Sequence, residues 1–206
     1  KYFVNQLEQK HFEYDLGSEK VLRDIGSVAD GKLVVGKRSY QLVVIPEEME
    51  NIDQNTFDLL KKFLSEGGKI LSFRNEIERL DGQMNNQVAE LQKSYPEQWM
   101  LAGSIDDDAV TSVFKTDGFA ITNISENKEF FHQRRILNDG QLLFVVNTNV
   151  SDQASAKIQA RGKSVVKIDL FTGEQNLVPF EKDGRDIQFE IALQPVGSAL
   201  YYISDR

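Results

Sequence analysis

The sequence predicts an α/β domain followed by an all-β domain: a parallel sheet, and then an antiparallel β-sandwich. The first observation is the stretch from Tyr40 to Phe73, which has the pattern of a strand, a helix and a second strand. In such a βαβ unit the strands pair in parallel, and the crossover is right-handed. The second observation is a change of period near residue 125, after which short apolar–polar alternations are separated by turn residues. We therefore expect two domains, residues 1–124 and residues 125–206.

The boundaries of the βαβ unit follow from residue chemistry. Residues 42–45 are a continuous apolar run, as in a strand buried on both faces, and Pro46 ends it because proline cannot donate to a sheet. Asp53 is placed to cap a helix. Gly67 and Gly68 end that helix, because the left-handed conformation of a C-cap suits glycine. The apolar face of the helix comprises Phe57, Leu60, Phe63 and Leu64.

The other expected elements are shorter. In the first domain we expect a hairpin around Asp30-Gly31, a short strand at residues 11–14, and a polar loop from residue 74 to 87. Four further helices are expected, at residues 1–10, 19–24, 85–95 and 105–115. In the second domain we expect seven strands, at residues 131–137, 142–147, 154–160, 165–170, 177–180, 187–193 and 199–203.

Composition excludes several classes of function. The 206 residues carry a formal charge of −8, so a nucleic acid or an anionic membrane surface is a poor partner. The chain has no cysteine, which excludes disulfides, thiolate catalysis and cysteine metal sites. No apolar run approaches the ~20 residues of a membrane-spanning helix. Because the chain begins at Lys1 within an apparent helix, we expect it to be part of a longer protein.

Two groups of carboxylates are candidates for chemistry. Glu47, Glu48 and Glu50 follow the main strand, where open α/β sheets place ligands, but a solvated approach to the next helix is the favoured interpretation. Three successive aspartates at residues 106–108 suggest a metal site. The favoured alternative is that they stabilise the positive end of a helix dipole, which Ser104 would cap. We assign no catalytic, cofactor-binding or metal-binding residue.

The two histidines, His11 and His132, have no partner at metal or catalytic spacing. On a strand, His132 and Arg134 share one face and Arg135 takes the other. These cations could hold a carboxylate or a sugar hydroxyl, or pair with Glu126, Glu129 or the acidic first domain. A salt bridge between the domains is the favoured interpretation. Aromatic residues that could stack on sugars are Tyr95, Trp99, Tyr201 and Tyr202.

Several segments together resemble one family. They are YQLVVIPEEM, TFDLLKKFLSEGGKIL, FFHQRRILNDGQLLFVVNTN, KIDLFTGEQ and LQPVGSALYYI. In this order they resemble the accessory region of large α-L-rhamnosidase-like glycoside hydrolases, over roughly residues 12–204. The resemblance implies a flavodoxin-like, class I glutamine-amidotransferase-like domain followed by a β-sandwich, beside a catalytic barrel. An active amidotransferase has a nucleophilic cysteine after the strand KILSF, whereas Arg74 follows here, so glutaminase activity is excluded.

The resemblance implies a non-catalytic accessory fragment of a polysaccharide-degrading glycoside hydrolase, which supports the catalytic domain of the same parent chain and its substrate cleft. It implies a periplasmic or secreted location, no cofactor, and glycan as a further possible partner. The first alternative is a stand-alone carbohydrate-binding or protein-interaction module, with Trp99 or Tyr202 as the sugar platform. The second alternative is an enzyme that uses Glu47 and Glu48.

Overall fold

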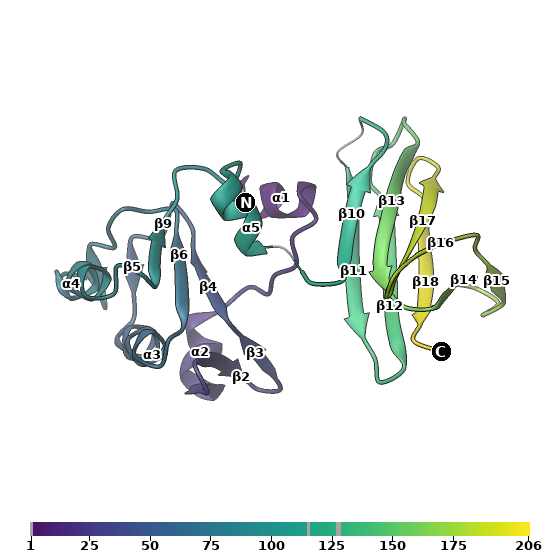
Figure 1. The fold of residues 1–206 in the computed structure, drawn as a ribbon. Helices are drawn as coiled ribbons and strands as arrows, with labels where there is room; N and C mark the ends of the chain where they lie inside the picture. Colours follow the sequence, from purple (N-terminus) through teal and green to yellow (C-terminus); the bar gives the residue numbers. More distant parts are fainter. Residues whose placement is uncertain (1, 115, 127–128) are drawn as a thin grey trace. The chain divides into compact units, whose positions relative to one another are not determined.

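The computed structural model describes residues 2–114, 116–126 and 129–206, and the chain divides into two compact units (Figure 1). The α/β unit comprises residues 14–111, and the β unit comprises residues 1–13 together with residues 112–206. The expected boundary lay near residue 124. Strand β10 (Phe119–Asn123), on the N-terminal side of that position, pairs with β13 (Ala154–Arg161) and so belongs to the β unit.

The α/β unit contains the expected βαβ arrangement. Strands β4 (Leu42–Ile45) and β6 (Lys69–Ser72) pair in parallel, and helix α3 (Gln54–Ser65) connects them. A third parallel strand, β9 (Trp99–Leu101), pairs with β6 and gives the order β4-β6-β9. Strand β9 was not expected from the sequence, because a strand of three residues shows no resolvable period.

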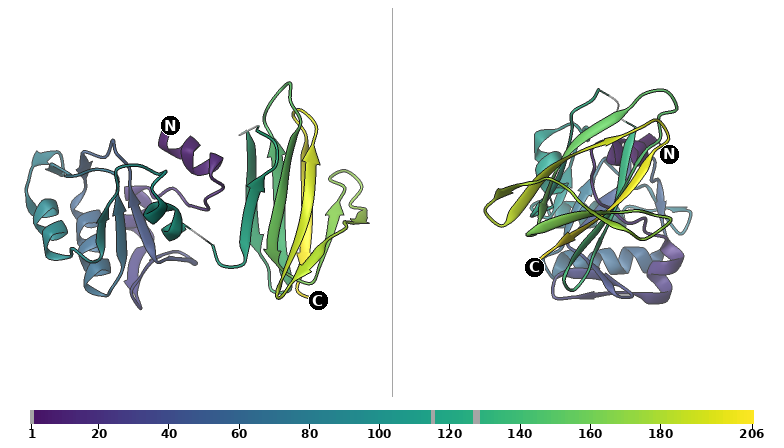
Figure 2. Two further views of the ribbon diagram at one scale, coloured as in Figure 1. Left: turned by 45° about the horizontal axis from the view of Figure 1, so that its top comes forward. Right: turned by 90° about the vertical axis from the view of Figure 1, so that its right-hand side faces the viewer.

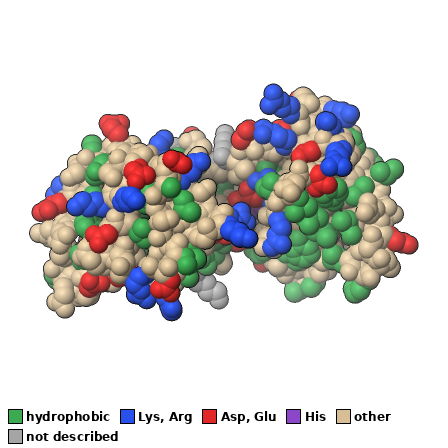
Figure 3. Space-filling view, turned by 90° about the horizontal axis from the view of Figure 1, so that it is seen from below, with side chains coloured by type: hydrophobic (Ala, Val, Ile, Leu, Met, Phe, Trp, Pro, Cys, Tyr) green, Lys and Arg blue, Asp and Glu red, His purple; other side chains and the backbone are tan. Residues whose placement is uncertain are grey.

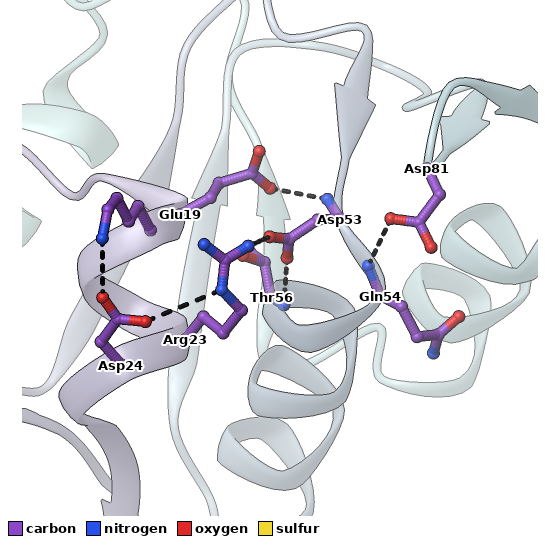
Figure 4. A network of polar contacts seen from close by, with 8 residues as sticks. Glu19, Arg23, Asp24, Asp53, Gln54, Thr56 and Asp81 are labelled. Carbon is purple, nitrogen blue, oxygen red and sulfur yellow. Dashed lines mark hydrogen bonds and ion pairs between the residues drawn. The ribbon is translucent and has the colours of Figure 1, made fainter.

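Three carboxylates accept hydrogen bonds from backbone amides at the start of α3 (Figure 4). The Asp53 side chain accepts a hydrogen bond from the Thr56 amide at 2.7 Å, which confirms the expected N-cap. The Asp53 amide donates to Glu19 at 2.7 Å, and the Gln54 amide donates to Asp81 at 3.1 Å. The N-terminus of a helix can hold a phosphate when its amides are free. At α3 the protein's own carboxylates already fill that role.

The stretch expected to be a polar loop forms a small sheet. Asp81 and Gly82 have φ angles of 49° and 76°, which suit the turn of a two-residue hairpin. Helix α2 (Glu19–Ile25) and the sheet β1-β2-β3 pack against α3, and the core includes Phe63, Leu64 and Ile70. The remaining elements are β1 (Gly26–Ala29), β2 (Lys32–Val35), β3 (Arg38–Tyr40), β5 (Asn51–Ile52), β7 (Arg79–Leu80), β8 (Gln83–Met84) and α4 (Gln87–Ser94).

The β unit consists mainly of two antiparallel sheets that share one hydrophobic core (Figure 2). The four-stranded sheet has the order β10-β13-β17-β16, and the five-stranded sheet has the order β11-β12-β18-β14-β15. Phe189 of the first sheet and Tyr201 of the second meet in the core, with ring centroids 5.4 Å apart. The remaining strands are β11 (Phe130–Ile136), β12 (Gly140–Asn147), β14 (Ser164–Ile168), β15 (Gln175–Leu177), β16 (Glu181–Asp183), β17 (Asp186–Leu193) and β18 (Ser198–Ser204).

Three expectations about elements were wrong. Residues 11–14 are not a strand, because helix α1 (Tyr2–Gln9) ends in a C-terminal motif in which His11 has a φ of 57° and Phe12 donates to the Leu7 carbonyl. Helix α5 (Asp108–Phe114) starts three residues later than expected, and its expected end, Lys115, lies outside the described residues. The strand expected at 177–180 is replaced by β15 and β16, which belong to different sheets.

Among the described residues, the longest helix is α3, with 12 residues, and none of their helices has the length and hydropathy that a membrane span requires.

Candidate functional site

The three glutamates that follow the main strand do not form an organised binding site. Glu47, Glu48 and Glu50 are exposed, and their carboxylates make no hydrogen bond or ion pair to any described residue. Ligands bind open α/β sheets where the strand order reverses. The described parallel strands instead follow one another in chain order, β4-β6-β9, so they contain no such reversal. The favoured interpretation, a solvated turn, agrees with this geometry.

Arg74 occupies the position at which the family resemblance would require a cysteine. The Ser72 hydroxyl donates to the Arg74 carbonyl at 2.6 Å and closes a tight turn after β6. The Arg74 guanidinium then donates to the carbonyl oxygens of Glu47 and Glu76, at 3.1 and 2.7 Å. Arg74 therefore ties together the loops that follow β4 and β6, which is a structural role.

The aspartates at residues 106–108 do not converge. Asp107 accepts a hydrogen bond from the Ser104 amide, and the Ser104 hydroxyl accepts one from the Asp106 amide, both at 3.1 Å. Asp108 is the first residue of α5. Ser104 thus organises the turn before the helix and does not cap it directly, which corrects the expected cap. No group of three or more possible metal ligands occurs among the described residues.

A hollow of about 360 Å³ lies on the α/β unit. The β7–β8 hairpin and the start of α4 line it, and its lining includes Glu76, Glu78, Asn85 and Asn86. Its other lining residues are Ile77, Met84 and Ala89, so the lining mixes carboxylates and amides with apolar side chains. We assign it no ligand.

The densest polar cluster lies in the β unit, where residues 11–13 meet β10 and β11. We call Glu13, Arg134, His11 and His132 the buried cluster. The Arg134 guanidinium donates to both oxygens of the Glu13 carboxylate, with the Nε–Oε1 distance at 2.7 Å. Arg134 also donates to Gln141 at 2.9 Å, and its Cζ lies 4.2 Å from the centre of the Phe119 ring. Bidentate pairing and a cation–π contact together fix this guanidinium.

The favoured interpretation of Arg134 was a salt bridge to the acidic first domain. The partner, Glu13, does come from residues 1–124, but it lies in the same compact unit as Arg134. As expected, Arg134 and His132 share one face of β11, while Arg135 points away and is exposed. The pair therefore fastens the N-terminal segment to the β unit.

The two histidines lie side by side in the cluster, with ring centroids 5.8 Å apart. His11 Nε2 is 3.0 Å from Asn123 Oδ1, and the His132 side chain is only 3% exposed, with its Nε2 atom 3.9 Å from Glu13. The Nδ1 atoms of both rings are buried and have no hydrogen-bond partner among the described residues. A protonated imidazole has two N–H groups to satisfy, so this environment favours the neutral form of each ring.

Burial and charge determine the ionisation of the cluster. Burial, with the neighbouring His11 and Arg134 charges, lowers the pKa of His132 to about 4 against the opposing effect of Glu13. Burial also lowers the pKa of His11, although Asn123 and Glu8 oppose it. Burial alone would raise the pKa of Glu13, but the hydrogen bonds and charge of Arg134 outweigh burial and lower it. At neutral pH the cluster is therefore one ion pair beside two neutral imidazoles.

This arrangement closes one side of the β unit. Strands β10 and β11 each lie at one edge of their sheet, and His11 contacts both, through Asn123 of β10 and the Phe130 ring of β11. The next residue, Phe12, stacks on Phe114 of α5 with ring centroids 4.6 Å apart. The cluster offers no nucleophile with an adjacent base, and its charged groups satisfy one another. The cluster therefore has a structural role: it holds the N-terminal segment against the β unit.

The aromatic residues considered as a sugar platform are mostly part of the two cores. Trp99 and Tyr201 are each 4% exposed, and Tyr95 packs against the core of the α/β unit. Tyr202 is half-buried, and its hydroxyl donates to the Asp139 carbonyl at 3.1 Å. A stacking platform needs exposed ring faces. Among the described side chains, Phe171 is an aromatic residue that is fully exposed, at 99%, and it was not a candidate from the sequence.

No protein-family model and no curated protein matches the sequence. Solved structures are similar in fold. The rhamnosidase from Novosphingobium sp. PP1Y matches 94% of this chain with a TM-score of 0.74 and 12% identity. The exo-carrageenase GH42 from Bacteroides ovatus matches 98% with a TM-score of 0.60 and 15% identity. The α-L-fucosidase isoenzyme 2 from Paenibacillus thiaminolyticus matches 99% with a TM-score of 0.57 and 10% identity.

At these identities the similarity shows the fold alone. This chain spans 20% of the rhamnosidase chain, 26% of the exo-carrageenase chain and 44% of the fucosidase chain. Each of these three chains is therefore much longer than the part that matches.

Proposed function

We propose that this chain is a non-catalytic accessory region of a polysaccharide-degrading glycoside hydrolase, of the α-L-rhamnosidase-like kind. One observation carries the proposal: structures of three glycoside hydrolases match at least 94% of this chain, although the match accounts for less than half of each of them. Both units are therefore matched together and in order, as parts of a longer chain.

The proposal includes an assignment of each unit. The α/β unit is a flavodoxin-like, class I amidotransferase-like domain, supported by the parallel order β4-β6-β9 and the crossover helix α3. The β unit is a β-sandwich, supported by two antiparallel sheets around one core. In the α/β unit, the Ser72–Arg74 turn lies where an active amidotransferase would have its nucleophilic cysteine.

The role of such a region is to support the catalytic domain and the sides of its substrate cleft. Its polar clusters suit this role, because Arg134 and Glu13 neutralise one another and the Glu47–Glu50 turn is solvated. A glycosidase needs two carboxyl groups ~5–10 Å apart across a sugar cleft, and the proposal places them in the catalytic domain of the parent chain. The proposed location is periplasmic or secreted, as for other enzymes that act on polysaccharides.

The test compares the longer polypeptide encoded by the same gene with a version that lacks this region. We expect the shortened enzyme to have a lower melting temperature, and the 206-residue chain alone to hydrolyse no aryl glycoside in a panel that includes α-L-rhamnosides. Turnover by the 206-residue chain that is lost in Glu47→Gln or Glu48→Gln, but kept in Glu50→Gln, would overturn the proposal in favour of an enzyme.

Direct glycan binding by this chain is the other candidate function, and Phe171 is the observation in its favour. A calorimetric titration across a glycan panel separates the two functions. Heat that disappears in Phe171→Ala would make this chain a binding module, whereas a flat titration leaves the supporting role.

A further inference from the structure

The two sheets of the β unit have very different outward faces. On the four-stranded sheet, the central outward row is Thr122, Lys157 and Glu190, paired across β10, β13 and β17. This face is polar, as expected for a sheet that meets water on one side. On the five-stranded sheet, most outward positions in the middle of the three central strands are apolar or aromatic, with serines towards the strand ends. The contrast is within one unit, so overall composition does not explain it.

The register gives the positions of these residues. One row pairs Leu142 with Tyr202 and Tyr202 with Val166, and the next row pairs Phe144 with Leu200 and Leu200 with Ile168. We call these six residues the outer patch. All six are half-buried, because neighbours on a sheet face shield one another. On β12 and β18 the residues between them, Leu143 and Tyr201, lie in the buried core, whereas Lys167 of β14 is exposed. Figure 3 shows exposed hydrophobic side chains gathered on this unit.

The hairpin β14–β15 extends the apolar surface. Leu177 pairs with Val166 at the end of the first row and is 89% exposed. In the turn between these strands, the Asp169 carboxylate accepts hydrogen bonds from the amides of Phe171 and Thr172, at 2.9 and 2.8 Å. This turn holds Phe171 in water with 99% of its surface exposed. This exposed phenyl ring, three residues after Ile168, adds apolar area that a partner could bury, and aromatic residues are enriched at interfaces.

We propose that the outer patch is the surface on which a neighbouring domain of the same polypeptide docks. The inference rests on the proposed function and names the partner as the catalytic domain, which would present an apolar surface with a carboxylate opposite Arg135. Arg135 is exposed, pairs with Leu142 at the edge of the first row, and has no hydrogen bond or ion pair to any described residue.

Area and charge favour a tethered domain over a second copy of this chain. The outer patch together with the flanking positions on β11 and β15 spans two rows across five strands, which outline on the order of 300 Å². This is well below the ~800 Å² that each partner contributes to a stable complex of separate proteins. Domains of one chain meet through smaller interfaces, because the linkage keeps their effective concentration high. Neither outward row contains a carboxylate, so the same face of a second copy offers Arg135 no counter-charge.

The test measures hydroxyl-radical labelling of the patch in the 206-residue chain and in the longer polypeptide of the same gene. We expect Phe144, Leu200 and Tyr202 to be labelled several-fold more slowly in the longer polypeptide. We expect the paired substitution Phe144→Glu and Leu200→Glu to restore fast labelling of Tyr202. The substitution Ala192→Glu, on the outward face of the other sheet, is the matched control and should leave the labelling of Tyr202 slow.

The charge is tested separately with Arg135→Glu, which should also restore labelling, while the exposed control Arg185→Glu should not. Equal labelling of the patch in both polypeptides would overturn the docking inference and leave the supporting role intact. A concentration-dependent dimer of the 206-residue chain that Phe144→Glu abolishes would overturn it in favour of a second copy. A gene that encodes no catalytic domain would overturn the proposed function, and the inference with it.

Discussion

Arg134 and Glu13 form a bidentate ion pair although they are 121 positions apart in the chain. The Arg134 side chain is 9% exposed and that of Glu13 is 29% exposed, so water only partly screens the pair. The pair is central because it fixes the segment that closes the β10–β11 side of the β unit.

Removing one partner should cost more than a surface substitution. We expect Arg134→Ala to lower the free energy of unfolding by about 2–4 kcal/mol, because it leaves the Glu13 charge without its partner. Arg135→Ala, on the exposed face of the same strand, should change it by less than ~0.5 kcal/mol. Urea unfolding measures both. If the double variant lost the sum of the free energies lost by Arg134→Ala and Glu13→Ala alone, the two side chains would not stabilise one another.

The buried cluster predicts that acid destabilises the protein. Burial lowers the folded-state pKa of His132 to about 4, below its usual value of 6.5, and it lowers the pKa of His11 too. The unfolded chain therefore binds more protons, and stability is present above pH 6.5 and lost as the pH falls towards 4. The lowered pKa of Glu13 acts in the same direction at lower pH.

The chain contains only these two histidines, which makes the test direct. We expect the urea midpoint to fall steadily between pH 6.5 and pH 4.5. In the double variant His11→Gln and His132→Gln, the midpoint should be much flatter over this range. A double variant with the slope of the parent protein would show that the histidines are not the cause.

The start of α3 gives a third prediction. Asp53→Ala removes the cap of the Thr56 amide and the 3.8 Å ion pair with Arg23 (Figure 4), and should cost about 1–2 kcal/mol. Asp53→Asn keeps a capping oxygen and should recover most of this loss. If Asp53→Asn were as unstable as Asp53→Ala in thermal unfolding, the charge would matter more than the cap.

The burial of Trp99 gives a fourth prediction. Trp99→Ala should lower the free energy of unfolding by about 3–5 kcal/mol, because the indole is 4% exposed in the core of the α/β unit. Phe171→Ala removes an aromatic ring that is 99% exposed, and should leave the melting temperature nearly unchanged. A Trp99→Ala variant of normal stability would mean that the ring is available at the surface.

The sequence by itself determined the elements whose signals are local. The apolar run before Pro46, the Asp53 cap and the Gly67–Gly68 end lie within a few residues of the structure they specify, so the βαβ unit was predictable. The hairpin between β11 and β12 was predictable for the same reason. The placement of His132 and Arg134 on one strand face followed from the period of two.

Only the tertiary structure decided which distant residues meet. Nothing near Glu13 indicates Arg134, and His11 adopts a left-handed conformation only because the end of α1 and the contact with Asn123 hold it there. The three-residue strand β9 exists because β6 pairs with it. The continuous apolar run of β12 is compatible with either sheet face, and the register alone reveals that Leu142 and Phe144 point outward. Local chemistry sets the conformation of a segment, whereas its partners depend on contacts across the whole fold.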